Sequence, residues 1–206
     1  HTCSAAAAGG RLDILQWVRA GGCPWGDFTC HNAARGGHLA ILEWARGERC
    51  PWGRFTMSAA AEMGHLDICE WLRYHRCPWD GNESLQAAAG GHIHILKWLR
   101  WHGCPWSEYT CSEAARGGNI ELLEWLRSKG CPWDDLSYHK AALGGHIETL
   151  KWLRSNGCPL TSSNACSGAA TGGQLETLKW LRSNGFPWDE DTCHAAAIEG
   201  HLDVLR

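Results

Sequence analysis

The chain has little Phe, Tyr and Met, and it has no long apolar run, although its hydrophobic content of 44% suffices for a buried core. Only three Phe, three Tyr and two Met occur among its 206 residues. No apolar run approaches the ~20 residues that a membrane-spanning helix needs, so we predict no membrane partner. The formal net charge is −3, and charged residues make up 20% of the chain. This balance gives no global positive field for nucleic acid, and we predict that the chain does not bind it.

Catalytic sequence signatures are also missing. The chain contains no Gly-x-Ser-x-Gly, no phosphate-binding loop, no Gly-x-Gly-x-x-Gly after a strand and no His-Glu-x-x-His. Its acidic and basic residues fall on regularly repeated positions, which is typical of a solvated surface. We therefore predict that the protein is not an enzyme and that it needs no cofactor.

Tryptophan and cysteine are in excess, with 14 and 12 copies, and they recur at a fixed interval. A Cys-Pro dipeptide and a separate Trp both return every 27 residues, and the last step is 28 residues because one residue is inserted. A period this regular predicts a single repeat array over residues 1–206. The repeats are expected to divide near Cys23, Cys50, Cys77, Cys104, Cys131, Cys158 and Phe186.

Each repeat predicts two short helices. The first follows Cys-Pro-Trp, where residues such as Ser107 can cap a helix N-terminus, and it ends at a Gly-Gly or similar pair. The second has the pattern of residues 66–73, in which Asp67, Glu70 and Arg73 form a narrow polar stripe. The other residues of this helix, including Trp71, are apolar and cover a wide part of its surface. We therefore predict that the second helix is buried on more than one side. The fold class is therefore all-α, a solenoid of about seven and a half stacked helix-turn-helix units.

The repeated series Ala-Ala-x-x-Gly-His-x-Glu-x-Leu-Lys-Trp-Leu-Arg-x-x-Gly resembles the ankyrin repeat, with the best local matches at residues 145–157 and 194–201. Each unit is about six residues shorter than the family's 33, and Cys-Pro-Trp stands where the family has a projecting β-hairpin. This compact CPW type is similar to arrays associated with large DNA viruses, algae and oomycetes. The resemblance implies an α-solenoid for protein–protein recognition, with the first helices on its inner side.

The cysteines have two interpretations, packing residues or ligands of a metal. Cysteine pairs seven residues apart occur as Cys23/Cys30 and Cys104/Cys111, but elsewhere the second cysteine becomes Met57, Ser84 or Tyr138. A metal site would not accept these residues interchangeably, whereas a small buried pocket would. Equivalent cysteines of adjacent repeats should lie about 10 Å apart, beyond the ~7 Å Cα limit of a disulfide. We favour free, buried thiols in a reducing compartment such as the cytoplasm, with a metal or disulfide as the alternative.

Histidines recur in the Gly-His turns, and the densest group is His92, His94 and His102 with Cys104. Asn119 takes the place of the turn histidine in one repeat, so hydrogen bonding at the turn explains the position. A His-x-His pair on a helix points its rings apart, which makes a metal site the weaker interpretation here. We predict no metal site.

A partner-binding face is predicted where the repeats differ from one another. The most varied positions lie nine, five and two residues before the repeated glycine, on one face of the first helix. Aromatic and Arg residues among mixed polar ones are typical of protein interfaces, although the face could also be idle solvated surface. We predict that a protein partner binds through Phe28, Asn32, Arg35, Phe55, Glu62, Gln86, Tyr109, Glu113, Arg116 and Lys140.

Self-association is the second functional hypothesis. Neither end of the chain shows a polar capping repeat, so uncovered apolar faces could stack end to end into a filament or a particle surface. Such an assembly would place the protein outside the cell or on a particle. The chain also begins and ends in mid-repeat, and we expect it to be a fragment of a longer protein.

Overall fold

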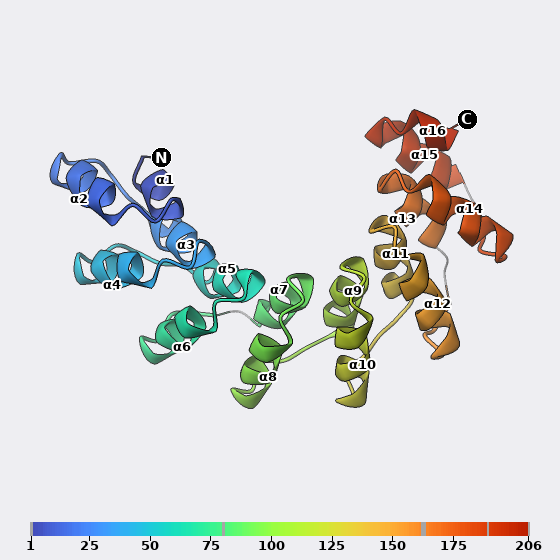
Figure 1. The fold of residues 1–206 in the computed structure, drawn as a ribbon, viewed down its shortest axis with the longest axis horizontal. Coiled ribbons are helices and arrows are strands. Elements are labelled where there is room, and N and C mark those ends of the chain that lie inside the picture. The colour runs from blue at the N-terminus through green and yellow to red at the C-terminus, as the bar shows by residue number, and fades with distance from the viewer. Residues whose placement is uncertain (1, 80, 162–163, 189, 206) are drawn as a thin grey trace. The chain divides into compact units, whose positions relative to one another are not determined.

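The computed structural model of the chain describes residues 2–79, 81–161, 164–188 and 190–205. These residues fall into two units, His1–Pro105 and Trp106–Arg206. Within the described ranges the chain forms helices, turns and bends and contains no strand, which confirms the predicted all-α solenoid class (Figure 1). None of the described helices has the length and apolar character needed to cross a membrane. The prediction of one continuous array stays a prediction.

In both units short helices alternate along the chain as first and second members of a repeat (Figure 1). The first unit contains α1 (Thr2–Ala8), α2 (Leu12–Ala20), α3 (Asp27–Arg35), α4 (Leu39–Gly47), α5 (Phe55–Met63), α6 (Leu66–Tyr74), α7 (Glu83–Ala89) and α8 (Ile93–Trp101). The second unit contains α9 (Glu108–Arg116), α10 (Ile120–Ser128), α11 (Leu136–Leu143), α12 (Ile147–Ser155), α13 (Ala165–Thr171), α14 (Leu175–Ser183), α15 (Glu190–Glu199) and α16 (Leu202–Leu205).

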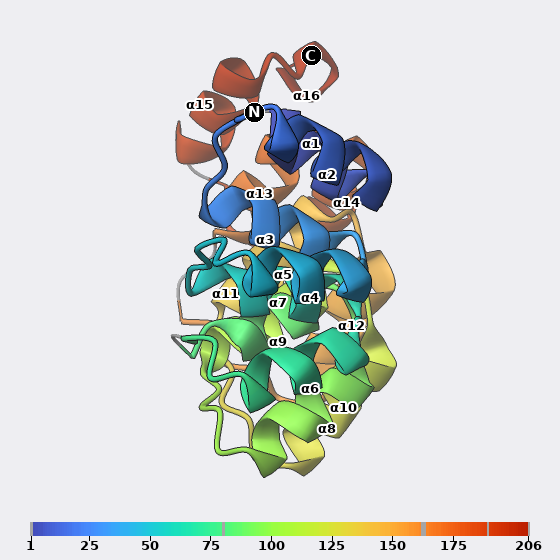
Figure 2. The same cartoon turned by 90° about the vertical axis from the view of Figure 1, so that its left-hand side faces the viewer.

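The first helices of successive repeats pack directly on one another. In the first unit α1 packs on α3, α3 on α5 and α5 on α7, and Figure 2 shows α1, α3 and α5 one below the other. In the second unit α9, α11, α13 and α15 follow the same order. Small side chains permit this close approach, because the distance between two helix axes depends on the residues at the contact. The Ala pairs at these contacts are fully buried: Ala33–Ala34, Ala60–Ala61, Ala114–Ala115, Ala141–Ala142 and Ala169–Ala170.

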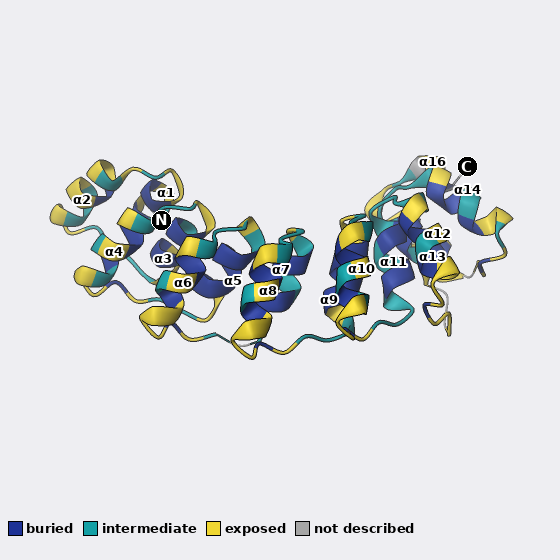
Figure 3. Cartoon of the chain, turned by 60° about the horizontal axis from the view of Figure 1, so that its bottom comes forward, coloured by how far each residue is buried: buried dark blue, intermediate teal, exposed yellow. Residues whose placement is uncertain are grey.

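The second helices are buried on one side only (Figure 3). In α6, Ile68 and Leu72 are fully buried, while the predicted polar stripe of residues 67, 70 and 73 is exposed. Trp71 is only half-buried, and Trp17 of α2 is 77% exposed. The expectation of burial on more than one side is therefore wrong for these tryptophans. They lie at the edge of the buried side, where a flat ring can cover a neighbour and still meet water.

The repeated Gly-His turns tie each repeat to the one before it. Gly37 has φ +76°, and a Cβ at this residue would come within 2.7 Å of the imidazole of His65, so both backbone and space require glycine. The Nε2 of that imidazole lies 3.3 Å from the carbonyl oxygen of Arg35, to which it donates. We call this arrangement the histidine tie. The imidazole covers the glycine in the same way at His38 over Gly10, His92 over Gly64, His146 over Gly118 and His201 over Gly173.

The Cys-Pro-Trp connector is held by side chains of the second helices on both sides of it. The guanidinium of Arg46, in the last turn of α4, lies 4.0 Å from the ring centroid of Trp52. The ring of Trp71, from α6, meets Trp52 edge-on at 5.9 Å between centroids. The pairs Arg127–Trp133 and Trp133–Trp152 repeat this arrangement in the second unit. The terminal Arg of the second helix thus stacks on the connector as well as suiting the helix dipole.

Candidate partner-binding face

The predicted partner-binding residues lie on the first helices, divided between the two units. The first unit carries Phe28, Asn32, Arg35, Phe55, Glu62 and Gln86, and the second unit carries Tyr109, Glu113, Arg116 and Lys140. Three of these residues expose large apolar rings: Phe28 is 69%, Phe55 54% and Tyr109 53% exposed. The third Phe of the chain, Phe186, is only 4% exposed, which shows that the exposed rings are not imposed by their residue type.

The charged members of this face pair with one another across adjacent repeats. Arg35 Nη1 lies 2.7 Å from Glu62 Oε2, and Lys140 Nζ lies 2.7 Å from Glu113 Oε1. Both pairs join residues 27 positions apart. Within its own repeat, Glu113 forms a second ion pair, with Arg116 Nη1 at 3.3 Å. Because exposed ion pairs contribute only about 0–1 kcal/mol, the Arg35–Glu62 pair can open toward a partner at little cost.

The two amides of the face differ in what holds them. Asn32 Nδ2 donates to the carbonyl oxygen of Ser4, in the first helix of the preceding repeat, at 3.1 Å. Gln86 is half-buried on α7. Asn32 therefore fixes the stacking of α3 on α1, so it has less freedom to contact a partner than the sequence pattern predicted.

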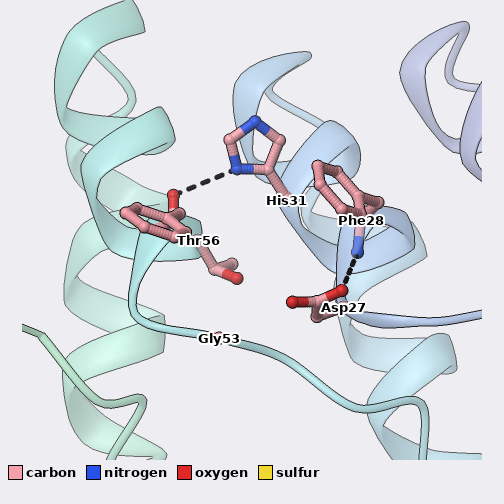
Figure 4. A pocket seen from close by; sticks show the side chains of 6 residues that line it. Asp27, Phe28, His31, Gly53 and Thr56 are labelled. Atoms are coloured by element: carbon pink, nitrogen blue, oxygen red, sulfur yellow. Dashed lines mark hydrogen bonds between the residues drawn. The ribbon is translucent and has the colours of Figure 1, made fainter.

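A cavity of about 300 Å³ lies between the first turns of α3 and α5, lined by Asp27, Phe28, His31, Gly53, Phe55 and Thr56 (Figure 4). His31 Nδ1 lies 3.1 Å from the carbonyl oxygen of Phe55, so α3 reaches across to α5. Asp27 Oδ1 accepts the backbone N–H of Phe28 at 3.0 Å, at the start of α3. We call this the Phe28–Phe55 cavity.

Four residues of this cavity, Asp27, His31, Gly53 and Thr56, were not among the predicted partner-binding residues. Asp27 and Gly53 lie at the starts of first helices, one and two residues ahead of a predicted ring, and His31 lies one turn beyond Phe28. A search of neighbouring repeats for aromatic residues at the same position would have found Phe28 and Phe55 as a pair. The lining residues could then have been read from the residues flanking each ring.

The thiols have different neighbours from those that the sequence predicted. The connector cysteine contacts the residue 20 positions before it, in the first helix of the preceding repeat. Ser84 Oγ lies 3.3 Å from Cys104 Sγ, and Cys30 contacts Cys50 at the same sequence spacing. The Cys30 S–H donates to the Cys50 sulfur, and this hydrogen bond together with burial raises the pKa of Cys30. All twelve cysteines are free, and ten of them are buried. Free, buried thiols were predicted, but their partner in the connector of the next repeat was missed.

The histidine group in the second half of the first unit is held by backbone carbonyl oxygens. His92 and His94 meet edge-on at 5.8 Å between ring centroids, so the expectation that these rings point apart is wrong. The reason is that His92 precedes α8 and is not yet helical. His92 Nε2 lies 3.0 Å from the Glu62 carbonyl oxygen, and burial lowers the pKa of His92. Across the described parts of the chain, no three His, Cys, Asp or Glu side chains gather as a metal ion would require.

Comparisons with known proteins agree with this architecture. A family model described as ankyrin repeats (many copies) matches residues 111–154. A solved structure, the human ASB11 ankyrin repeat domain, is similar in fold, with a TM-score of 0.60 and 18% sequence identity over 97% of each chain. Among curated proteins, none matches the chain in sequence.

Proposed function

We propose that this chain is a non-catalytic scaffold that binds a protein partner through the variable face of its first helices, because residues 111–154 match an ankyrin-repeat model and the fold is similar to an ankyrin repeat domain. Ankyrin repeats generally mediate protein–protein interaction. The observation that supports this particular face is the exposure of Phe28, Phe55 and Tyr109 at one repeated position. Rigid aromatic rings lose little conformational freedom on binding, and they are common anchors of protein interfaces.

The charges on the face supply specificity in this proposal. Arg35 and Arg116 are exposed, and each guanidinium already meets a carboxylate. A partner that offers its own carboxylate can share or replace these contacts, because Arg keeps donors beyond those used in a single pair. The aromatic rings would then provide most of the affinity, and the charges would select the partner.

The free thiols support a reducing location for the scaffold. Ten of the twelve cysteines are buried and none is in a disulfide. Disulfides form and persist in oxidising compartments, so an array of free thiols suits a cytoplasm better than the outside of a cell.

A pull-down experiment tests the proposed face. The variant with Phe28, Phe55, Tyr109 and Arg116 all changed to Ala should keep its far-UV circular dichroism and lose captured proteins identified by mass spectrometry. A matched control changes Trp17, Tyr74 and Trp101 to Ala, because these aromatic residues are 77%, 83% and 86% exposed but lie on second helices. Capture that survives the first set of changes, or that is lost equally in the control, would contradict the proposal.

A dilution series in light scattering separates partner binding from self-association. A protein whose mass stays that of one chain at every concentration fits a scaffold for a different partner. A mass that grows with concentration, and that falls when the four face residues are changed, would make a second copy of the chain the partner.

A further inference from the structure

The Phe28–Phe55 cavity has the size of a side-chain site. Its volume of about 300 Å³ is at the lower end of the ~300–1,000 Å³ of small-molecule pockets, which leaves room for one long side chain rather than a cofactor. Two of its walls are exposed Phe rings, whose faces carry the negative part of the aromatic quadrupole. Apolar walls of this kind suit the methylene stem of a long side chain.

The polar groups of the cavity are acceptors or carry negative charge. Asp27 uses Oδ1 for the N–H of Phe28, while Oδ2 is turned toward Gly53, where a Cβ would lie 3.3 Å away from it. In its neutral form His31 donates through Nδ1 to a carbonyl oxygen, so its other ring nitrogen is an acceptor.

The buried hydroxyl of the lining has no hydrogen-bond partner among the residues that the structure describes. Thr56 Oγ1 is buried, and it forms no hydrogen bond with any described residue. Figure 4 shows the side chains of Thr56 and Asp27 facing each other across the cavity. A buried hydroxyl without a partner is costly, and a bound donor would satisfy it.

The chain already places a cation on one of these rings. The guanidinium of Arg54 lies 4.8 Å from the ring centroid of Phe55. The ring therefore accepts a cation in the geometry of a cation–π contact, although this Arg does not line the cavity. Charge complementarity with Asp27 favours the same kind of ligand inside it.

We infer that the cavity receives a cationic side chain, Lys or Arg, from the protein partner. The stem lies between Phe28 and Phe55, and the cationic head meets the carboxylate of Asp27. The inference rests on the proposed scaffold function and specifies the chemistry that one part of the face recognises. It gives Asp27, which the sequence pattern did not select, a direct role in partner choice.

Peptide binding followed by two-dimensional NMR of the ¹⁵N-labelled chain tests this inference. The probes are Gly-Ser-Gly-X-Gly-Ser-Gly peptides in which X is Arg, Lys, citrulline or norleucine. Citrulline has nearly the shape of Arg without its charge, and norleucine keeps a Lys-like stem without the ammonium. The Arg and Lys peptides should shift the amide signals of residues 27–31 and 53–56. Their affinities should exceed those of the neutral peptides about three- to tenfold, as an exposed ion pair and a cation–π contact together provide.

Variants of the cavity make the test specific. Asp27→Asn keeps an acceptor for the N–H of Phe28, and it should remove the preference of Arg over citrulline. Gly53→Val does not require a left-handed backbone, and its side chain would fill the cavity and prevent all four peptides from binding. Tyr109→Ala is the matched control, because it removes an exposed ring from the same repeated position in the other unit and should change nothing.

The outcomes separate this inference from the proposed function. Equal affinities for Arg and citrulline, or shifts outside the cavity residues, would overturn the inference, whatever the pull-down shows. A charge preference that Asp27→Asn removes supports the cationic ligand. If the fourfold variant, which also lacks the cavity rings Phe28 and Phe55, still captures proteins, the proposed function fails and the cavity is not where that partner binds. Loss of capture without any charge preference would support the face and reject the cationic ligand.

Discussion

The histidine tie makes a quantitative prediction about glycine substitutions. Gly37 and Gly22 have nearly the same left-handed backbone, with φ +76° and +80°. A Cβ at Gly37 would lie 2.7 Å from the imidazole of His65, whereas a Cβ at Gly22 would meet nothing within 4 Å. Both changes to Ala introduce left-handed strain of about 1–2 kcal/mol, and both gain about 0.4–1 kcal/mol from a less flexible unfolded chain. These two contributions cancel when the variants are compared.

The remaining difference is the energy of the tie itself. Gly37→Ala must displace the imidazole of His65, which then loses its 3.3 Å hydrogen bond to the carbonyl oxygen of Arg35. Such a bond contributes about 1 kcal/mol, so Gly37→Ala should be about 1 kcal/mol less stable than Gly22→Ala. With a urea m-value of about 2 kcal/mol per molar, its unfolding midpoint should lie about 0.5 M lower. Far-UV circular dichroism follows this transition.

A double variant completes the experiment. When His65→Ala is added to Gly37→Ala, the imidazole no longer obstructs the new methyl group, and the two substitutions should couple by about 1 kcal/mol. The same His65→Ala change added to Gly22→Ala should be additive. Equal urea midpoints for the two glycine variants, or additive behaviour in both backgrounds, would refute the account of the tie given above.

Four other substitutions test the connector, a half-buried histidine and a left-handed arginine. Cys104→Ala should lower the free energy of unfolding by about 1 kcal/mol and Trp106→Ala by about 2–3 kcal/mol. Thermal melts in which Cys104→Ala is the less stable variant would show that the sulfur matters more than the ring. Because burial lowers the pKa of His92, the unfolded chain binds this proton first. The unfolding free energy should therefore fall as the pH drops from about 7.5 to about 5.5, and a pH series of urea titrations should show a flatter slope for His92→Gln. Arg49 has φ +60°, so Arg49→Gly should raise the thermal midpoint through a gain of about 0.5–1 kcal/mol, and a lower midpoint would show that its side chain matters more than its backbone.

Features that repeat along the chain could be predicted from the sequence. The 27-residue period predicted the positions of both helices in each repeat. The glycine ahead of each turn histidine was predicted as a turn residue, and its φ of +75° at Gly200, +79° at Gly145 and +84° at Gly64 confirms it. These features depend on local conformation and composition, so the sequence of a single repeat is enough to predict them.

Contacts between repeats could not be predicted in the same way. The intervals of 20 residues between thiols and 30 residues between the His65 imidazole and the Arg35 carbonyl depend on how far one repeat is displaced on the next. The sequence contains no direct measure of that displacement. The Arg35–Glu62 pair is an exception, since opposite charges at the same position of adjacent repeats already indicate a partner. The Phe28–Phe55 cavity needed the structure, because side-chain rotamers decide whether two rings enclose a space.

The one irregular repeat shows what the histidine tie permits. The extra residue of the array falls between Gly145 and Gln174, and the Gln side chain still covers this glycine, with Oε1 2.5 Å from where its Cβ would be. The connector can therefore change length while the tie on the other side of the repeat keeps its place. A segment that runs from one tie glycine to the next is therefore a structural module, because the same glycine–side-chain contact lies at each of its ends. Evolution or a protein engineer can duplicate, delete or exchange such segments, and each exchange brings in a new set of face residues without a new fold.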